Sequence, residues 1–415
     1  MPDRPRKTDV LVIGGGPAGL AAAASAAEAG ARVLLVDRNR KLGGILNQCI
    51  HDGFGLHTFG EVLTGPEFAA HYVNKVLEAG VEVYTDTLVA GISAGGDVIL
   101  TSFGSRWGIR AGAVVLAMGC RERTRGMIRI PGTRPAGVYT AGTAQWLTNM
   151  ANIRVGNRIV ILGSGDIGLI MARRLRWEGA DVVAVIELLP YPSGLPRNIT
   201  QCLDDYDIPL YLSHSVTEIH GRDRLEGVTV ARYDDSRRPI PGTEFRIECD
   251  TLLLSVGLIP ENELSRRGGV DIDRVTLGPR VDDRYVTSVD GVFACGNVLH
   301  IHDIADWAAD EGTRAGRTAA DYALGRVDRH RERIPVEARE GIRYVVPQSV
   351  DRTAGDALLS FRVREPGEDK VVTVKAGGDP IASERFRRVH PATMIQLSVP
   401  LKLPRDVDRL EVSLS

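Results

Sequence analysis

The chain has 415 residues, of which 43% are hydrophobic and 25% are charged, and its formal net charge is −2. This length allows two or three domains with full cores, and the near-neutral charge excludes a global field for binding nucleic acid or an anionic membrane. No apolar stretch reaches the ~20 residues that span a bilayer, and the N-terminus lacks the apolar segment of a secretion signal, so we expect a cytoplasmic protein.

The first predicted element is an apolar strand, residues 10–13, that leads into a glycine-rich turn and an alanine-rich helix. A second strand, residues 32–37, ends at Asp37 and is followed by Arg38. In this fingerprint one glycine allows a tight turn, one lets the backbone approach a pyrophosphate, and one permits close helix packing, while the acid binds ribose hydroxyls. The predicted dinucleotide-binding residues of this turn are Gly14, Gly16, Pro17, Ala18 and Gly19, and the next loop adds Gly43 and Gly44.

The rest of the first region also alternates between helix and strand. Pro66 and Gly80 bracket a helix over residues 66–78, and a continuous apolar run over 113–118 is typical of a buried parallel strand. Between them we expect an antiparallel insert of three short strands at residues 81–85, 88–92 and 98–102.

A second fingerprint follows the strand at residues 158–162. Its turn and helix start contain Gly163, Gly165, Asp166, Ile167 and Gly168, and the next strand ends at Glu187. A carboxylate at this position favours a free ribose 2′-hydroxyl and repels a 2′-phosphate, so the sequence favours NADH over NADPH. Two such units in one chain predict electron transfer between two bound dinucleotides.

A third apolar strand, residues 292–295, ends in Gly296 and Asn297, and an alanine-rich helix follows over residues 303–324. From about His330 the pattern changes to short β-runs that Pro, Gly and Asp separate. This tail predicts a small all-β module. The runs lie at residues 344–346, 358–363, 371–374, 394–399 and 410–414.

With both fingerprints placed, residues 8–328 resemble the two-dinucleotide-binding flavoproteins of the pyridine nucleotide-disulfide oxidoreductase superfamily. Three further segments match that pattern: residues 116–119 with Ala117 and Gly119, residues 255–262 with Gly257, and residues 292–297 with Asn297 in place of the usual Asp. The resemblance implies FAD at the first fingerprint and in the late Gly296–Asn297 motif, and a nicotinamide cofactor at the second.

The resemblance also implies an α/β fold in which a nicotinamide domain is inserted into a flavin domain. Both domains are Rossmann-like, and a C-terminal all-β domain follows them. The expected limits are residues 1–121 and 283–329 for the flavin domain, 122–282 for the nicotinamide domain, and 330–415 for the β-rich domain.

The five cysteines depart from the disulfide reductases of this superfamily, which carry a cysteine pair. No pair here has C-x-x-C spacing, and the loop after Gly44 contains Cys49 alone, so disulfide reductase activity is disfavoured. Residues 43–55 and 295–303 resemble a subgroup associated with glycerol-3-phosphate dehydrogenases and, more distantly, with amine and opine dehydrogenase subunits. That narrower resemblance implies a partner protein.

Cys49, His51 and His302 are the candidate catalytic residues. Cys49 is a thiol beside the expected flavin or a packing residue, and one of the histidines His51, His57, His300 and His302 is a proton donor for reduced flavin or a solvated side chain. We predict no metal, because His300 and His302 have no further ligand at a usable spacing.

Three functions follow as hypotheses. The first is an NADH:acceptor oxidoreductase that passes electrons from flavin to a partner dehydrogenase or electron carrier. The second is the FAD subunit of an amine, imino acid or opine dehydrogenase. The third is a non-enzymatic interaction protein that binds flavin and nucleotide, with the β tail as its working surface.

Overall fold

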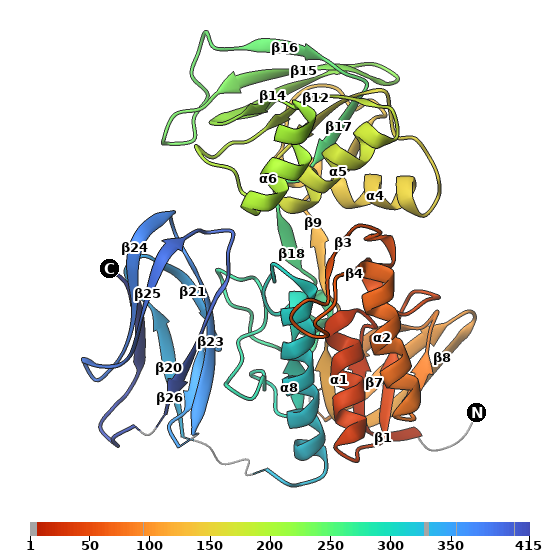
Figure 1. The fold of residues 1–415 in the computed structure, drawn as a ribbon. Helices are drawn as coiled ribbons and strands as arrows, with labels where there is room; N and C mark the ends of the chain where they lie inside the picture. Colours follow the sequence, from red (N-terminus) through yellow and green to blue (C-terminus); the bar gives the residue numbers. More distant parts are fainter. Residues whose placement is uncertain (1–5, 94, 328–331, 354, 402) are drawn as a thin grey trace. The chain divides into compact units, whose positions relative to one another are not determined.

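The computed structural model describes residues 6–93, 95–327, 332–353, 355–401 and 403–415, which form two compact units (Figure 1). The first unit comprises Met1–Cys120 and Pro260–Ser415, and the second comprises Arg121–Ile259. The chain returns to the first unit at residue 260, earlier than the predicted limit of 282. The reason is that the Asn262 side chain donates to the carbonyls of Leu277 and Val298, at 3.0 and 2.8 Å, and so belongs to the first unit. The predicted limit at 329/330 lies outside the described residues.

The first unit is built on one mixed sheet whose strand order is β5-β2-β1-β8-β7-β6, with β19 also paired to β8. Parallel pairing of β1 with both β2 and β8 places the predicted apolar runs at its centre, where they are buried on both faces. The strands are β1 (Arg6–Ile13), β2 (Val33–Val36), β5 (Glu82–Tyr84), β6 (Leu88–Ile92), β7 (Asp97–Ser102), β8 (Ser105–Leu116) and β19 (Val292–Ala294).

Strand β8 is longer than the apolar run that predicted it, because it has two kinds of neighbour. Residues 105–110 pair antiparallel with β7, and residues 109–116 pair parallel with β1. The first half alternates between buried and exposed side chains, so only the second half reads as continuously apolar.

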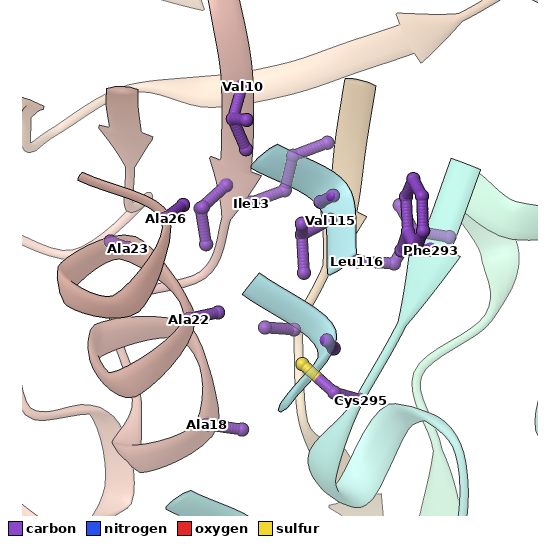
Figure 2. Packing of buried hydrophobic residues seen from close by; sticks show 14 of the residues in the cluster. Val10, Ile13, Ala18, Ala22, Ala23, Ala26, Val115, Leu116, Phe293 and Cys295 are labelled. Carbon is purple, nitrogen blue, oxygen red and sulfur yellow. The ribbon is translucent and has the colours of Figure 1, made fainter. Parts of the chain in front are cut away.

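Two helices, α1 (Pro17–Glu28) and α8 (Ala305–Ala323), pack against each other in this unit (Figure 1). A Cβ added to Gly312 would lie 2.1 Å from the Ala18 carbonyl oxygen, and one added to Gly316 would lie 2.1 Å from that of Ala22. These glycines therefore allow the helix backbones to approach closely. Figure 2 shows Ala18 and Ala22 pointing from α1 into the core, in which Phe293 and Cys295 also lie.

The predicted helix at 66–78 is confirmed as α2 (Gly65–Glu78). Thr64 accepts from the Glu67 backbone N–H, and the Glu67 carboxylate accepts from the Thr64 backbone N–H, which is a capping box. The unit's remaining short elements are η1 (Gly44–Gln48), β3 (Asp52–Phe54), β4 (Leu63–Thr64), α7 (Glu263–Arg267) and η3 (Gly296–Val298).

The second unit repeats the parallel arrangement with strand order β10-β17-β11-β12-β13, next to an antiparallel sheet β14-β15-β16. Its elements are α3 (Arg125–Ile128), β10 (Val138–Thr140), α4 (Ala141–Asn149), β11 (Arg158–Leu162), α5 (Asp166–Trp177), β12 (Asp181–Ile186), α6 (Pro196–Cys202), η2 (Asp204–Tyr206), β13 (Leu210–Tyr211), β14 (His214–Gly221), β15 (Leu225–Arg232), β16 (Phe245–Glu248) and β17 (Thr251–Leu254). Where the chain passes between the units, β9 (Cys120–Glu122) pairs with β18 (Leu258–Pro260).

The predicted β-rich tail is confirmed as two sheets with their own apolar core. One sheet has the order β22-β20-β27-β24-β25 and the other β21-β23-β26. The strands are β20 (Arg333–Ala338), β21 (Ile342–Val346), β22 (Ser349–Asp351), β23 (Asp356–Val363), β24 (Gly367–Ala376), β25 (Asp379–Val389), β26 (Ile395–Pro400) and β27 (Leu410–Leu414). Sequence analysis missed β20, β22 and β25; the last is an edge strand with mostly exposed side chains, so it lacks an apolar alternation.

Among the described residues, no helix combines the length and the apolar character needed to cross a membrane.

Candidate functional sites

The first glycine-rich turn connects β1 to α1, and each of its glycines has a different environment. Gly14 has φ 107°, and a Cβ there would lie 2.4 Å from the Ala117 carbonyl oxygen. A Cβ on Gly19 would lie 1.8 Å from the Gly14 carbonyl oxygen. A Cβ on Gly16 would meet no heavy atom within 4 Å. Gly14 and Gly19 are thus glycines because of the protein's own packing, whereas Gly16 borders open space.

That open space lies at the N-terminus of α1. Gly16 is the N-cap residue and supplies no side-chain hydrogen bond, and Pro17 follows it, so no side chain at the cap competes for the first-turn N–H groups of Ala18 and Gly19. The second glycine loop closes on the same place, because the Gly43 N–H donates to the Gly15 carbonyl at 2.7 Å. A Cβ on Gly44 would lie 3.0 Å from the Gly16 Cα. The N–H groups at the start of α1 are free of side-chain caps, and the glycine at this point lets a ligand come close to the backbone. Both features suit the binding of a pyrophosphate.

Asp37 follows β2 with its carboxylate fixed beside this turn. Its two oxygens accept the backbone N–H groups of Gly15 and Asn39, each at 2.6 Å. The acid is thus held at the carboxyl edge of the sheet, where the ribose of a dinucleotide would lie. The neighbouring predicted residue Arg38 is exposed.

In the second unit, the turn between β11 and α5 has the same arrangement of glycines, with less free space beside the middle one. A Cβ on Gly163, which has φ 97°, would lie 2.1 Å from the Ser255 carbonyl oxygen, and one on Gly168 would lie 2.7 Å from the Ser255 Cβ. A Cβ on Gly165 would lie 3.3 Å from the Ser255 Oγ. Gly165 therefore has less free space beside it than Gly16 has. Helix α5, like α1, has no side-chain hydrogen bond at its N-cap residue.

Two acids shape the second site. The Asp166 carboxylate accepts from the Leu195 N–H at 2.8 Å and from the Asn198 side chain at 2.6 Å, which holds the following loop near the start of α5. Glu187, after β12, accepts from the Ser164 N–H at 2.9 Å and the Leu189 N–H at 2.9 Å.

Sequence analysis missed two serines that complete the network around Glu187. The Ser164 and Ser193 hydroxyls donate to Glu187 Oε2 at 2.5 and 2.9 Å. Ser164 occupies the variable position between the first two glycines, where Gly15 stands in the first site, and that difference was the only available signal. Of the other predicted residues, Ile167 packs against the apolar core and Gly257 has φ 99°.

The late motif brings a third set of residues together in the first unit. Gly296 has φ 72°, a Cβ there would lie 2.5 Å from the Ala18 Cβ, and its N–H donates to Glu311 Oε1 at 2.6 Å. The motif therefore lies against the start of α1 and is anchored by a carboxylate on α8. The crossover residues are fixed as well, because the Ala117 N–H donates to the Ile13 carbonyl at 2.9 Å and the Gly119 carbonyl accepts from the Glu261 N–H at 3.0 Å.

His300, His302 and Glu311 form a buried cluster next to this motif. The Nε2 atoms of His300 and His302 lie 2.9 and 3.5 Å from Glu311 Oε2, and one potential ligand atom from each residue lies within 4.8 Å of the others. The prediction that no third ligand has a usable spacing was wrong, because the turn before α8 brings Glu311 back to both imidazoles.

The pKa values of Glu311 and His300 are shifted from their usual ranges. Burial by itself would raise the pKa of Glu311, but His302 and His300 outweigh it and hold that pKa well below its usual range. Burial lowers the pKa of His300, against the attraction of Glu311. A buried carboxylate that stays ionised needs a compensating positive charge nearby.

The other two catalytic candidates have local contacts on a different segment. The buried Cys49 thiol donates to the Ile45 carbonyl at 3.3 Å, and His51 Nδ1 lies 2.8 Å from the Asp52 carbonyl oxygen. Sequence analysis also missed Asp306, a buried acid on α8 that accepts the N–H groups of Gly55, His57 and Thr58 at 3.0–3.2 Å. Asp306 thereby fixes the loop after β3.

Comparison with known proteins gives similarity over most of the chain. A family model described as pyridine nucleotide-disulphide oxidoreductase matches residues 8–312. Hydrogen cyanide synthase subunit HcnB of Pseudomonas protegens is 27% identical over 75% of this chain and 69% of its own length. An opine oxidase subunit from Agrobacterium tumefaciens is 27% identical over 76% of this chain, which covers 65% of that relative. The solved thioredoxin reductase of T. acidophilum matches 77% of this chain and 99% of its own, with 25% identity and a TM-score of 0.64.

Proposed function

Because the chain belongs to the pyridine nucleotide-disulphide oxidoreductase family, we propose that this oxidoreductase moves a hydride between NADH and FAD. The observation that carries the proposal is the duplicated geometry: two βαβ units, each with an uncapped helix start behind a close-approach glycine and a fixed acid after the next strand. We assign FAD to the first site, whose late Gly296–Asn297 motif lies against α1, and the nicotinamide cofactor to the second.

The cofactors would supply the redox chemistry, with flavin exchanging a hydride with the nicotinamide ring. The chain's own residues bind and orient. The starts of α1 and α5 would hold the diphosphates, and Asp37 and Glu187 would hold ribose hydroxyls. The late motif, with Gly296 buried, would line one side of the first site.

The environment of Glu187 supports NADH over NADPH. Four hydrogen bonds hold this carboxylate in place, so that a 2′-phosphate would meet a carboxylate that cannot turn away. In Glu187→Gln we expect the ratio of kcat/KM for NADH over NADPH to fall by roughly tenfold or more, since a charged hydrogen bond contributes about 1.5–3 kcal/mol. Glu178→Gln, at the exposed end of α5, is the matched control. An unchanged ratio in Glu187→Gln contradicts the assignment.

The cysteines support a function other than disulfide reduction. None of the five, all of which lie in the described part of the chain, forms a disulfide. Burial raises the pKa of Cys202, raises that of Cys249 to about 12 and raises that of Cys295 well above its usual range. A thiol held in its neutral form is a poor nucleophile for dithiol exchange.

We further propose that the flavin passes its electrons to a partner, either a dehydrogenase of the glycerol-3-phosphate type or an electron carrier. The second candidate is the FAD subunit of an amine, imino acid or opine dehydrogenase. It is favoured by the two relatives described as subunits, of an opine oxidase and of a hydrogen cyanide synthase. Cytoplasmic location stays a prediction.

Anaerobic titration of the purified flavoprotein tests these alternatives. We expect NADH to bleach the flavin absorbance within seconds at one equivalent, and bleaching by opines or secondary amines alone would replace the first candidate with the second. A colourless protein that does not bind added FAD, or a flavin that neither donor reduces, contradicts both. The third hypothesis, a non-enzymatic protein, does not agree with the family.

A further inference from the structure

The side chain of Asn297 has an orientation that its neighbours determine. Its Oδ1 accepts the backbone N–H of His302 at 2.9 Å, and a backbone N–H is always a donor, so the atom at this position must be the amide oxygen. The Nδ2 end then faces the Cys120 sulfur at 3.7 Å. The His302 ring atom Nδ1 lies 3.2 Å from the same Oδ1. Nδ1 must therefore carry a hydrogen.

The other ring nitrogen of His302 also faces an acceptor. Its Nε2 lies 3.5 Å from Glu311 Oε2, the oxygen that also accepts from His300 Nε2, while Oε1 accepts the Gly296 N–H. A bare nitrogen lone pair would be repelled by a carboxylate, whereas an N–H there makes an ion pair. The geometry thus places a hydrogen on both nitrogens of His302.

His300 cannot supply this positive charge at the same cost. Its Nδ1 is buried and has no hydrogen-bond partner within the part of the chain that the structure describes. A protonated His300 would bury an N–H with no acceptor, whereas the neutral form with hydrogen on Nε2 buries only a lone pair. The same atom argues against a metal at the cluster, since a metal-bound imidazole donates its other N–H to a second group.

We propose that His302 is a buried imidazolium paired with the Glu311 carboxylate, and that this ion pair positions the flavin motif and offsets the charge of Glu311. The His302 and Glu311 side chains are only 2% and 7% exposed, so solvent screens their attraction weakly. The inference rests on the proposed function in one respect, namely that FAD occupies the site that the Gly296–Asn297 segment borders. The imidazolium cancels the charge of the Glu311 carboxylate, which by itself would disfavour the anion of reduced flavin.

The C-terminal β module holds residues 298–304, which we call the histidine segment, in place against the first unit's core. Arg362 on β23 pairs with Asp303 and donates to the Ile301 carbonyl at 3.0 Å. The Met394 N–H donates to the second oxygen of Asp303 at 2.6 Å. The segment between Asn297 and α8 is therefore bonded both to α8 and to the module.

Several other titratable or charged groups face this cluster or its partners. Cys295 and Tyr285 face Glu311, and Tyr344 on β21 and Arg362 on β23 face His300. Cys120 on β9 faces Asn297. Asp303 is paired with Arg362, and Glu311 is the carboxylate that forms an ion pair with His302.

Nitrogen NMR of the full-length chain labelled with ¹⁵N-histidine tests the charge directly, with and without FAD. The His302 signals are assigned as those lost in His302→Gln. We expect hydrogen on both ring nitrogens at pH 7, because both nitrogens face acceptors. A neutral His302 at pH 7 in folded protein overturns the proposal, and so does a stoichiometric zinc or iron found in the purified protein by elemental analysis.

Variants of the partners sharpen the test. Glu311→Gln keeps an acceptor for the Gly296 N–H but removes the anion, so His302 should become neutral at pH 7. His220→Gln, on β14 in the second unit, is the matched control. In FAD-bound protein, His302→Gln should shift the flavin midpoint potential to more negative values, and His220→Gln should leave it unchanged.

The two claims fail separately. An unchanged potential in folded, FAD-bound His302→Gln overturns the positioning role. A charged His302 in a protein that cannot bind FAD supports the ion pair and contradicts the proposed function instead.

Discussion

At the scale of single residues, one fingerprint contains glycines of two physical kinds. Gly19 is required because any side chain would collide with the Gly14 carbonyl, whereas Gly16 has ordinary backbone angles, with φ −80°, and open space where its side chain would be. The sequence pattern treats both glycines alike. Only the surroundings show which one serves the fold and which one leaves room for a ligand.

The two glycines should respond differently to substitution. We expect Gly16→Val to fold with a melting temperature close to that of the wild type but to bind FAD at least about tenfold more weakly, because its side chain occupies the space for the pyrophosphate. Gly19→Ala should unfold at a lower temperature. Calorimetry and FAD titration measure both, with Gly108→Ala, also free of neighbours, as the control. Normal FAD affinity in Gly16→Val would remove the first site from the proposal.

Glu311 makes stability depend on pH. Folding lowers the pKa of the Glu311 carboxyl. The ionised carboxylate therefore stabilises the native state at pH values above its pKa in the unfolded chain, about 4.3, and this stabilisation is lost as the pH falls towards the lower pKa of the folded state. We expect Glu311→Leu to lower the free energy of unfolding at pH 7 by about 3–5 kcal/mol, since it breaks a buried ion pair. The difference from wild type should shrink below pH 4. Urea unfolding at pH 7, 5 and 3 measures it, and a difference independent of pH would contradict the ionised state of Glu311.

At the scale of elements, the contact between α1 and α8 links the two halves of the flavin site. Helix α1 starts at the first glycine turn, and α8 carries Glu311, which holds the late motif. Gly312 and Gly316 lie one turn apart on α8 and let it approach the backbone of α1. The spacing of the helices therefore sets the distance between the two parts of the first site.

Widening this contact should damage stability and cofactor binding together. In Gly312→Ala the new Cβ would lie 2.1 Å from the Ala18 carbonyl oxygen, so the helices must separate. We expect a loss of about 1–3 kcal/mol in the free energy of unfolding and a lower FAD content after purification. Arg317→Ala, on the exposed side of α8, is the control. Wild-type stability in Gly312→Ala would show that the helices do not pack this closely.

At the scale of the whole molecule, the chain consists of two compact units with one candidate site in each. The first unit also contains the C-terminal β module, which bonds to the histidine segment through Arg362. Ligand binding stabilises the structure that binds it and leaves separate structure unaffected. The two cofactors should therefore protect different parts of the chain.

Amide hydrogen exchange measures this separation without any turnover. We expect FAD to slow exchange in β1, α1 and η3, and NAD⁺ to slow it in β11, α5 and the loop after β12. At 100 times the dissociation constant, each ligand adds about 2.7 kcal/mol to the stability of its unit. Protection of α1 by NAD⁺, or of α5 by FAD, would reverse the assignment of cofactors to sites.

The chain's sequence by itself determined both βαβ units and a β-rich tail, whereas the insertion of one region into another was an implication of the family resemblance. The units and the tail follow from local patterns: apolar strands, glycines at fixed spacing, and an acid after the next strand. Sequence did not reveal β25, which has no alternating pattern, or the hydroxyl network around Glu187. Only the tertiary structure brought Glu311 to His300 and His302, because a loop and nearly two turns of helix α8 separate them along the chain. The local pattern of apolar and polar residues shows which side of a helix or strand is buried. A buried charge pair depends instead on which helices and loops, separate along the chain, pack together.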